Sequence, residues 1–158
     1  MIRVLARDTA AWHDDVWVVD ATPVECARSR DAVMRSDLAG WAQYGYRARH
    51  SSYFWGLRLH LVCTPSVLPV AFALAGAKAG GQETLLDIFT AEPRLLAERP
   101  GQTLTGDKTY FGADLQTQRA QTGAVLLRPA RKGEPDPAAS PLFELLRQTL
   151  GSVGRMNC

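Results

Sequence analysis

The chain has 158 residues, 46% of them hydrophobic and 22% charged, a composition that indicates a folded protein of about one domain and excludes a disordered or fibrous one. No apolar run approaches the roughly 20 residues that cross a bilayer, and the first residues lack the apolar region of a signal peptide, so we expect a cytoplasmic protein with no membrane partner. The formal net charge of +2 does not by itself indicate binding to nucleic acid.

Three apolar segments in the first half of the chain predict strands, and they are residues 16–19, 53–63 and 67–74. The middle segment alternates, with Leu57, Leu59 and Leu61 on one face and Arg58 and His60 on the other. A Thr-Pro-Ser turn separates it from the third segment, so these two segments predict an antiparallel hairpin.

Helices and strands alternate in the second half. The expected elements are a helix at 83–91 with a further turn at 95–96, a strand at 102–107, a polar helix at 114–121, a strand at 124–127, a loop at 132–140 and a helix that begins at Ser140. The whole order predicts a mixed α/β protein with a central sheet. It is the order of a ribonuclease-H-like fold, and other sheets share it.

The cysteines and motifs exclude several kinds of site. Cys26, Cys63 and Cys158 are odd in number and lie far apart, which predicts reduced thiols rather than disulfides or a zinc knuckle. The chain has no GxxxxGK[ST] or GxGxxG run, so ATP and dinucleotide chemistry are not indicated.

Basic and aromatic residues are concentrated between residues 28 and 58. Six arginines stand there against two aspartates, an excess of four positive charges, and six aromatic residues lie among them. This mixture suits phosphate contacts and base stacking. A solvated protein surface is the alternative interpretation.

Two aspartates follow predicted strands. Asp20 directly follows the run at 16–19, and Asp107 lies at the tip of the strand expected at 102–107. Carboxylates at strand ends in an α/β sheet often face a binding crevice, and a pair of them suits Mg²⁺ or Mn²⁺. The alternative is that both are turn or capping residues.

Five blocks of the sequence resemble the catalytic domain of bacterial insertion-sequence transposases of the DDE type. They are VVDATPVECARSRD, YGYRARHSSYFWGLRLHLVCT, LPVAFALAGA, LTGDKTYFG and LRQTLGSV. The resemblance implies a ribonuclease-H-like mixed sheet with flanking helices, and it implies that Asp20 and Asp107 are catalytic, metal-binding carboxylates. It also implies DNA transposition by strand cleavage and strand transfer with Mg²⁺ or Mn²⁺ at transposon ends.

The last block departs from the family pattern, which there has Arg, three residues, Glu, six residues and Lys. With Arg147 on the Arg, Gly151 falls on the Glu and Cys158 on the Lys. Glu144 lies about 10.5 Å from Gly151 along a helix, too far to replace that Glu without a register shift. We therefore expect a C-terminally incomplete, truncated catalytic domain over 16–158, preceded by an N-terminal remnant or linker over 1–15.

Five basic residues are candidates for contact with DNA, and they are Arg47, Arg49, Arg58, Lys108 and Arg147. Arg58 occupies a position where the family has a basic residue, and Lys108 follows Asp107. A surface ion pair or a solvated side chain is the alternative for them.

Three functional hypotheses follow. The first is a transposase catalytic domain, inactive in this chain because Gly151 replaces the expected Glu. The alternative is a non-catalytic fragment that binds DNA or a transposase subunit and inhibits a full-length transposase. The third, a metal-dependent nuclease unrelated to transposition, needs Glu144 or Glu25 to complete the acidic pair. Expected partners are transposon-end DNA and either a second copy of the chain or a full-length transposase.

Overall fold

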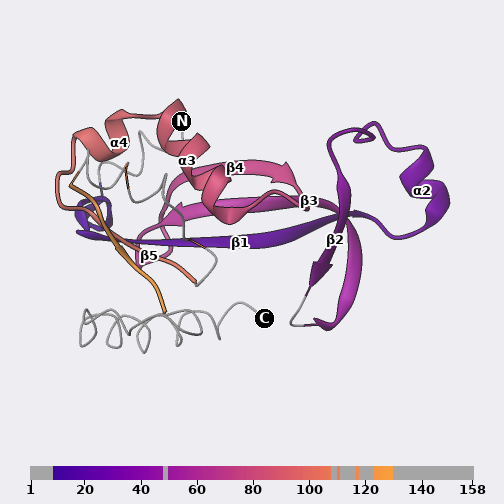
Figure 1. Ribbon diagram of the computed structural model, residues 1–158, viewed down its shortest axis with the longest axis horizontal. Coiled ribbons are helices and arrows are strands. Elements are labelled where there is room, and N and C mark those ends of the chain that lie inside the picture. The colour runs from indigo at the N-terminus through magenta and orange to yellow at the C-terminus, as the bar shows by residue number, and fades with distance from the viewer. Residues whose placement is uncertain (1–8, 48–49, 108–109, 111–116, 118–122, 130–158) are drawn as a thin grey trace.

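The computed structural model describes residues 9–47, 50–107, 110, 117 and 123–129, and within them the chain forms a six-stranded mixed sheet (Figure 1). The strands are β1 (Val16–Ala27), β2 (Gln43–Arg47), β3 (Ser52–Cys63), β4 (Pro69–Gly76), β5 (Thr103–Thr105) and β6 (Val125–Leu127). The helices are the 3-10 helix η1 (Ala10–His13), α2 (Arg30–Met34), α3 (Gly81–Ala91) and α4 (Arg94–Ala97).

A long antiparallel pair, β1 and β3, forms the middle of the sheet. The other edge of β3 pairs with β2 along its first part and with β4 along its second, both antiparallel. On the far side of β1 lie β5 and then β6, both parallel. Three antiparallel strands followed by parallel ones confirm the predicted mixed α/β sheet.

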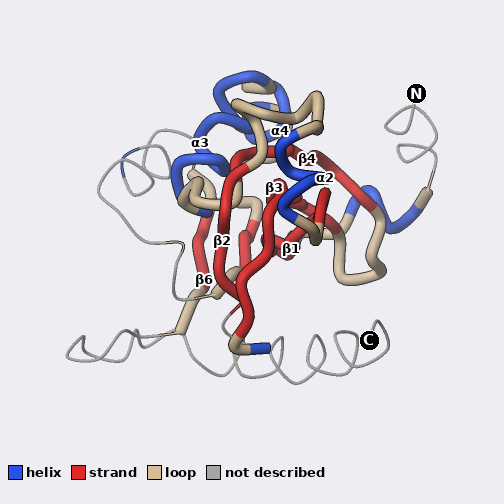
Figure 2. The backbone as a smooth tube through the Cα atoms, turned by 90° about the vertical axis from the view of Figure 1, so that its right-hand side faces the viewer, coloured by secondary structure: helices blue, strands red, loops and turns tan. Residues whose placement is uncertain are grey.

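The β1–β3 ribbon extends well beyond the rest of the sheet. Its far end carries β2 and α2, whereas α3, α4 and β5 lie toward the other end (Figure 1). Figure 2 views the molecule from the end at which β2 and α2 lie. The ribbon kinks where the pairing register shifts between Glu25 and Ala27. Gly56 lies opposite this bulge, where a β-carbon would collide with the carbonyl oxygen of Val24, so the close approach requires glycine.

One face of the sheet, the inner face, is buried beneath α3 and α4. Trp17 and Val19 of β1 and Val62 of β3 belong to the core cluster. The helices contribute Leu85, Ile88, Phe89, Leu95 and Leu96. Because Leu85, Ile88 and Phe89 recur at helical spacing, α3 presents one apolar stripe to the sheet. Burial of this stripe fixes the helix over β3 and β4, which it contacts.

The opposite, outer face carries the three leucines of β3, which are half-buried, together with Phe72 and Leu74 of β4, which are exposed. The predicted alternation along β3 is therefore confirmed. The better-buried side, however, is the one with His60 and Val62, since the helices cover that side. His60 is only 2% exposed.

Other predicted elements differ from the structure in their lengths. The strand expected at 16–19 continues to Ala27, because β3 offers it a partner over that whole length. The strand expected at 102–107 is limited to Thr103–Thr105. The expected helix at 83–91 begins at Gly81, and its further turn is α4. The short elements η1, α2 and β2 had no predicted counterpart.

Several expectations fall outside the described residues. These are the loop at 132–140, the last helix and, apart from the helical Thr117, the polar helix at 114–121. In the part of the chain that the structure describes, no helix is long and apolar enough to span a membrane.

Candidate active site

Asp20 lies within β1 rather than at its end, which corrects the expectation from sequence. It pairs with Leu61 of β3, and its Oδ1 accepts a hydrogen bond of 2.8 Å from the backbone N–H of Ala21. The strand continues past it because β3 pairs with β1 on one side. On the other side β5 has already ended, so the edge of β1 beside Asp20 is left without a strand partner among the described residues.

Asp107 comes to the same place through the register of β5. Trp17 pairs with Leu104 and Val18 with Thr105 in parallel. Extending this register by two residues brings Asp107 beside Asp20. The intervening Gly106 supports this placement, because a β-carbon there would lie 2.7 Å from Cγ2 of Val19.

The two aspartates line one pocket of about 340 Å³. The other walls come from Ala21, Arg58, Tyr110 and the start of α3 with the two residues before it, namely Ala79, Gly80, Gly81, Gln82 and Glu83. The structure thus brings together three predicted site residues, Asp20, Asp107 and Arg58, which are far apart in sequence. Both aspartates are exposed.

Arg58 reaches the pocket from β3. Its Nε is buried and has no hydrogen-bond partner among the described residues. A guanidinium beside two carboxylates, yet bonded to neither, leaves its donors available to an anion such as phosphate.

His60 is next to Arg58 on the inner face of β3, and neither of its ring nitrogens has a hydrogen-bond partner in the described structure. Burial lowers the pKa of His60, the charge of Arg58 lowers it further, and Asp20 acts in the opposite direction. The imidazole is therefore held in its neutral form.

The same charges also shift the pKa values of Tyr110 and Cys63. Burial raises the pKa of Tyr110 well above its usual value, and the charges of Asp20 and then Asp107 raise it further. Burial also raises the pKa of Cys63, with a smaller contribution from Asp20. Burial and the nearby carboxylates thus favour the neutral form of both side chains.

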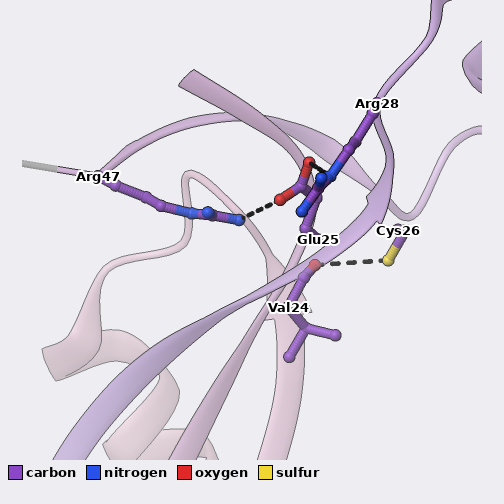
Figure 3. Close-up of polar contacts among 5 residues, drawn as sticks. All are labelled: Val24, Glu25, Cys26, Arg28 and Arg47. Atoms are coloured by element: carbon purple, nitrogen blue, oxygen red, sulfur yellow. Dashed lines mark hydrogen bonds and ion pairs between the residues drawn. The ribbon is translucent and has the colours of Figure 1, made fainter. Parts of the chain in front are cut away.

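Arg47, a predicted DNA contact, lies elsewhere. Its guanidinium is 2.7 Å from the Glu25 carboxylate (Figure 3). It also lies 5.0 Å from the ring centroid of Phe54. Arg28 pairs with the other oxygen of Glu25 at 3.0 Å. Arg47 therefore ties β2 to β1 and holds one end of the ribbon together.

Glu25 is the residue proposed from sequence as a substitute third carboxylate. Both of its carboxylate oxygens are paired with arginines, Arg28 and Arg47. The hydrogen bond from Arg47 is the largest cause that lowers its pKa. It lies five residues beyond Asp20 on β1, roughly 16 Å at 3.3 Å per residue. It does not line the pocket. The other candidates, Arg49, Lys108, Glu144, Arg147 and Gly151, lie outside the described residues.

Sequence reasoning missed Tyr110 and the start of α3. Tyr110 follows Asp107 by three residues, a spacing that a turn brings close, and its backbone N–H donates to the carbonyl of Asp107. Glu83 adds a third acidic residue to the pocket wall. Among the residues that the structure describes, however, no group of three or more His, Cys, Asp or Glu side chains is close enough to hold a metal ion.

Comparison with known proteins gives one match. The family model of the transposase DDE domain matches residues 11–139, which is most of the chain. No curated protein and no solved structure matches it. The mixed sheet, with antiparallel β1, β3 and β4 and parallel β5 and β6, agrees with the ribonuclease-H-like fold of that family. The chain therefore belongs to the family of transposase DDE domains, whose members act in DNA transposition.

Proposed function

We propose that this chain is a catalytic domain for DNA transposition in which Asp20 and Asp107 bind Mg²⁺ or Mn²⁺ and direct cleavage and transfer of a DNA strand at transposon ends. The observation that carries the proposal is the shared pocket, which both carboxylates line together with Arg58. The family points to DNA as the substrate. An acidic pair beside a guanidinium that has no ion pair among the described residues suits its phosphodiester.

The chemistry of the acidic pair fits such a metal. Mg²⁺ is usually held by one or two carboxylates, with waters and substrate phosphates completing its octahedron. When bound, the ion polarises a phosphate and activates the attacking oxygen. The protein's own part is to fix the carboxylates through the β1–β5 register and to offset phosphate charge with Arg58.

Activity of this chain should be low. The family pattern calls for a third carboxylate where this sequence has Gly151. Two carboxylates leave the metal more loosely held, so we propose weak metal binding and little or no strand cleavage.

A second candidate function is a non-catalytic one, in which the chain binds DNA or a transposase subunit and inhibits a full-length transposase. The exposed tyrosines at the end of the β1–β3 ribbon that carries β2 favour this function. Tyr44, Tyr46 and Tyr53 are exposed there on one face, and the rings of Tyr46 and Tyr53 lie 5.0 Å apart. Exposed aromatic rings suit stacking with unpaired bases, and a second copy of the chain is the other partner such a surface suits.

Metal binding provides the test. Titration of Mn²⁺ by calorimetry into Asp20→Asn and Asp107→Asn should give an affinity roughly tenfold or more below that of the unaltered chain. Asp37→Asn is the matched control, because Asp37 is exposed and lies outside the pocket. Equal affinities in all three variants would contradict the metal site.

Cleavage of end-bearing DNA then separates the two candidate functions. Little cleavage, with salt-dependent DNA binding that Asp20→Asn leaves unchanged, would favour the non-catalytic role. Robust Mn²⁺-dependent cleavage by the purified chain would contradict the proposed inactivity.

A further inference from the structure

Tyr110 spans the boundary between the core and the pocket. Its side chain belongs to the core cluster and is 3% exposed, yet Tyr110 also lines the pocket with Asp20 and Asp107. The ring lies against Gly106, since a β-carbon there would be 2.8 Å from its Cδ2. Tyr110 thus packs in the core while it also lines the pocket that contains the acidic pair.

The hydroxyl of Tyr110 has no hydrogen-bond partner among the residues that the structure describes. The hydroxyl oxygen is not one of the fully buried polar atoms that lack a partner in the described structure. It is therefore accessible from the pocket that Tyr110 lines. Asp20, Asp107 and Arg58 all act on it electrostatically. A neutral donor with no hydrogen-bond partner among the described residues therefore lines the same pocket as these three charged groups.

Backbone hydrogen bonds place Tyr110 close to Asp107. The N–H of Tyr110 donates to the carbonyl of Asp107 at 3.3 Å, which closes a turn directly after β5. Gly106 donates in turn to Leu127 of β6, so the turn is also attached to the neighbouring strand. The backbone of Tyr110 is therefore joined to that of Asp107, and Gly106 joins the same stretch of chain to β6.

We propose that the Tyr110 hydroxyl donates a hydrogen bond to a phosphate oxygen of DNA seated in this pocket. The inference rests on the proposed function, because it takes DNA as the ligand. Carboxylates can only accept hydrogen bonds, so they cannot bind a phosphate oxygen directly. Arg58, Tyr110 and Gln82 are the lining residues whose side chains carry donors. Of these, Tyr110 is the one joined by a backbone hydrogen bond to Asp107.

The difference in charge gives a measurement that distinguishes Tyr110 from Arg58. DNA affinity is measured for the full chain by fluorescence anisotropy with a labelled duplex and Mn²⁺, over a series of salt concentrations. Tyr110→Phe removes one hydrogen bond to a charged acceptor, so the Kd should rise about tenfold. The slope of log Kd against log salt should stay unchanged, because no counterion-releasing charge is lost.

Arg58→Gln is the contrasting variant, and it should weaken binding and reduce that slope by about one. Ser66→Ala is the control for loss of a hydroxyl, because Ser66 is exposed and does not line the pocket. It should bind as the unaltered chain does.

Three results would overturn the inference. Equal Kd values for Tyr110→Phe and the unaltered chain would exclude the contact while leaving the proposed function intact. A fall in the unfolding midpoint of Tyr110→Phe that accounts for the lost affinity would assign the hydroxyl a structural role. Absence of DNA binding by the unaltered chain would overturn the proposed function and this inference together.

Discussion

Val18 of β1 pairs in parallel with Thr105 of β5, and this register decides where the acidic pair forms. Asp20 and Asp107 each lie two residues further along the chain than these paired residues. β5 ends directly after Thr105 while β1 continues to Ala27, so a pocket opens beside β1 where its neighbour stops. The unequal lengths of two neighbouring strands thus create the site.

Gly106 should be essential to this register. A β-carbon at this position would lie 2.7 Å from Val19 Cγ2 and 2.8 Å from Tyr110 Cδ2, so Gly106→Ala forces buried groups apart. We expect a loss of stability of about 1–3 kcal/mol, measured by urea unfolding. Gly80→Ala is the control, because its nearest contact would be an ordinary 3.4 Å from the flexible Glu83 side chain. Similar losses in both variants would argue against close packing at Gly106.

The Arg47–Glu25 pair should stabilise the end of the ribbon. Both side chains are about three-quarters buried, and Arg47 also stacks on Phe54. Arg47→Gln should therefore lower the midpoint of urea unfolding. Arg28→Gln should leave the midpoint nearly unchanged, because the Arg28 side chain is 87% exposed and solvent screens its pairing with Glu25. If the two variants unfold alike, Arg47 is not the structural tie that its contacts indicate.

His60 should make stability depend on pH. Its folded-state pKa is lowered from 6.5, so the unfolded chain binds the proton more readily. Stability should be full above pH 6.5 and decrease as the pH falls below that value, until the folded state is protonated as well. His60→Gln should flatten this part of the profile in unfolding measurements from pH 8 to 5. The exposed His13, changed to Gln, is the control and should leave the profile intact.

The exposed tyrosines should contribute to binding of single-stranded DNA. Stacking of a base on an aromatic ring contributes roughly 1–3 kcal/mol, so Tyr44→Ala should weaken binding about fivefold or more in fluorescence anisotropy. Phe72→Ala is the control, since Phe72 is a similarly exposed ring on β4, away from the ribbon end. If Phe72→Ala weakens binding as much, the effect is one of general hydrophobicity.

Local patterns predicted the parts of the fold that depend on neighbouring residues. The apolar run before Asp20, the alternation along β3 and the helical spacing of Leu85, Ile88 and Phe89 each identified an element of the right type. Strand β2 was missed because Gly45 and its flanking exposed tyrosines give no apolar alternation. Its structure depends on pairing with β3.

By itself the sequence determined the mixed α/β class and identified the two aspartates as candidate site residues, each after an apolar run. Only the tertiary structure decided which residues meet them. Parallel pairing brings Asp107 to Asp20, a turn adds Tyr110, and packing of α3 over β3 and β4 supplies the opposite wall. The tertiary structure also pairs Arg47 with Glu25, which is 22 residues away in the sequence. The physical reason is that periodicity records which face of an element is buried, whereas register and strand length, which made this pocket, arise from pairing between segments far apart in the chain.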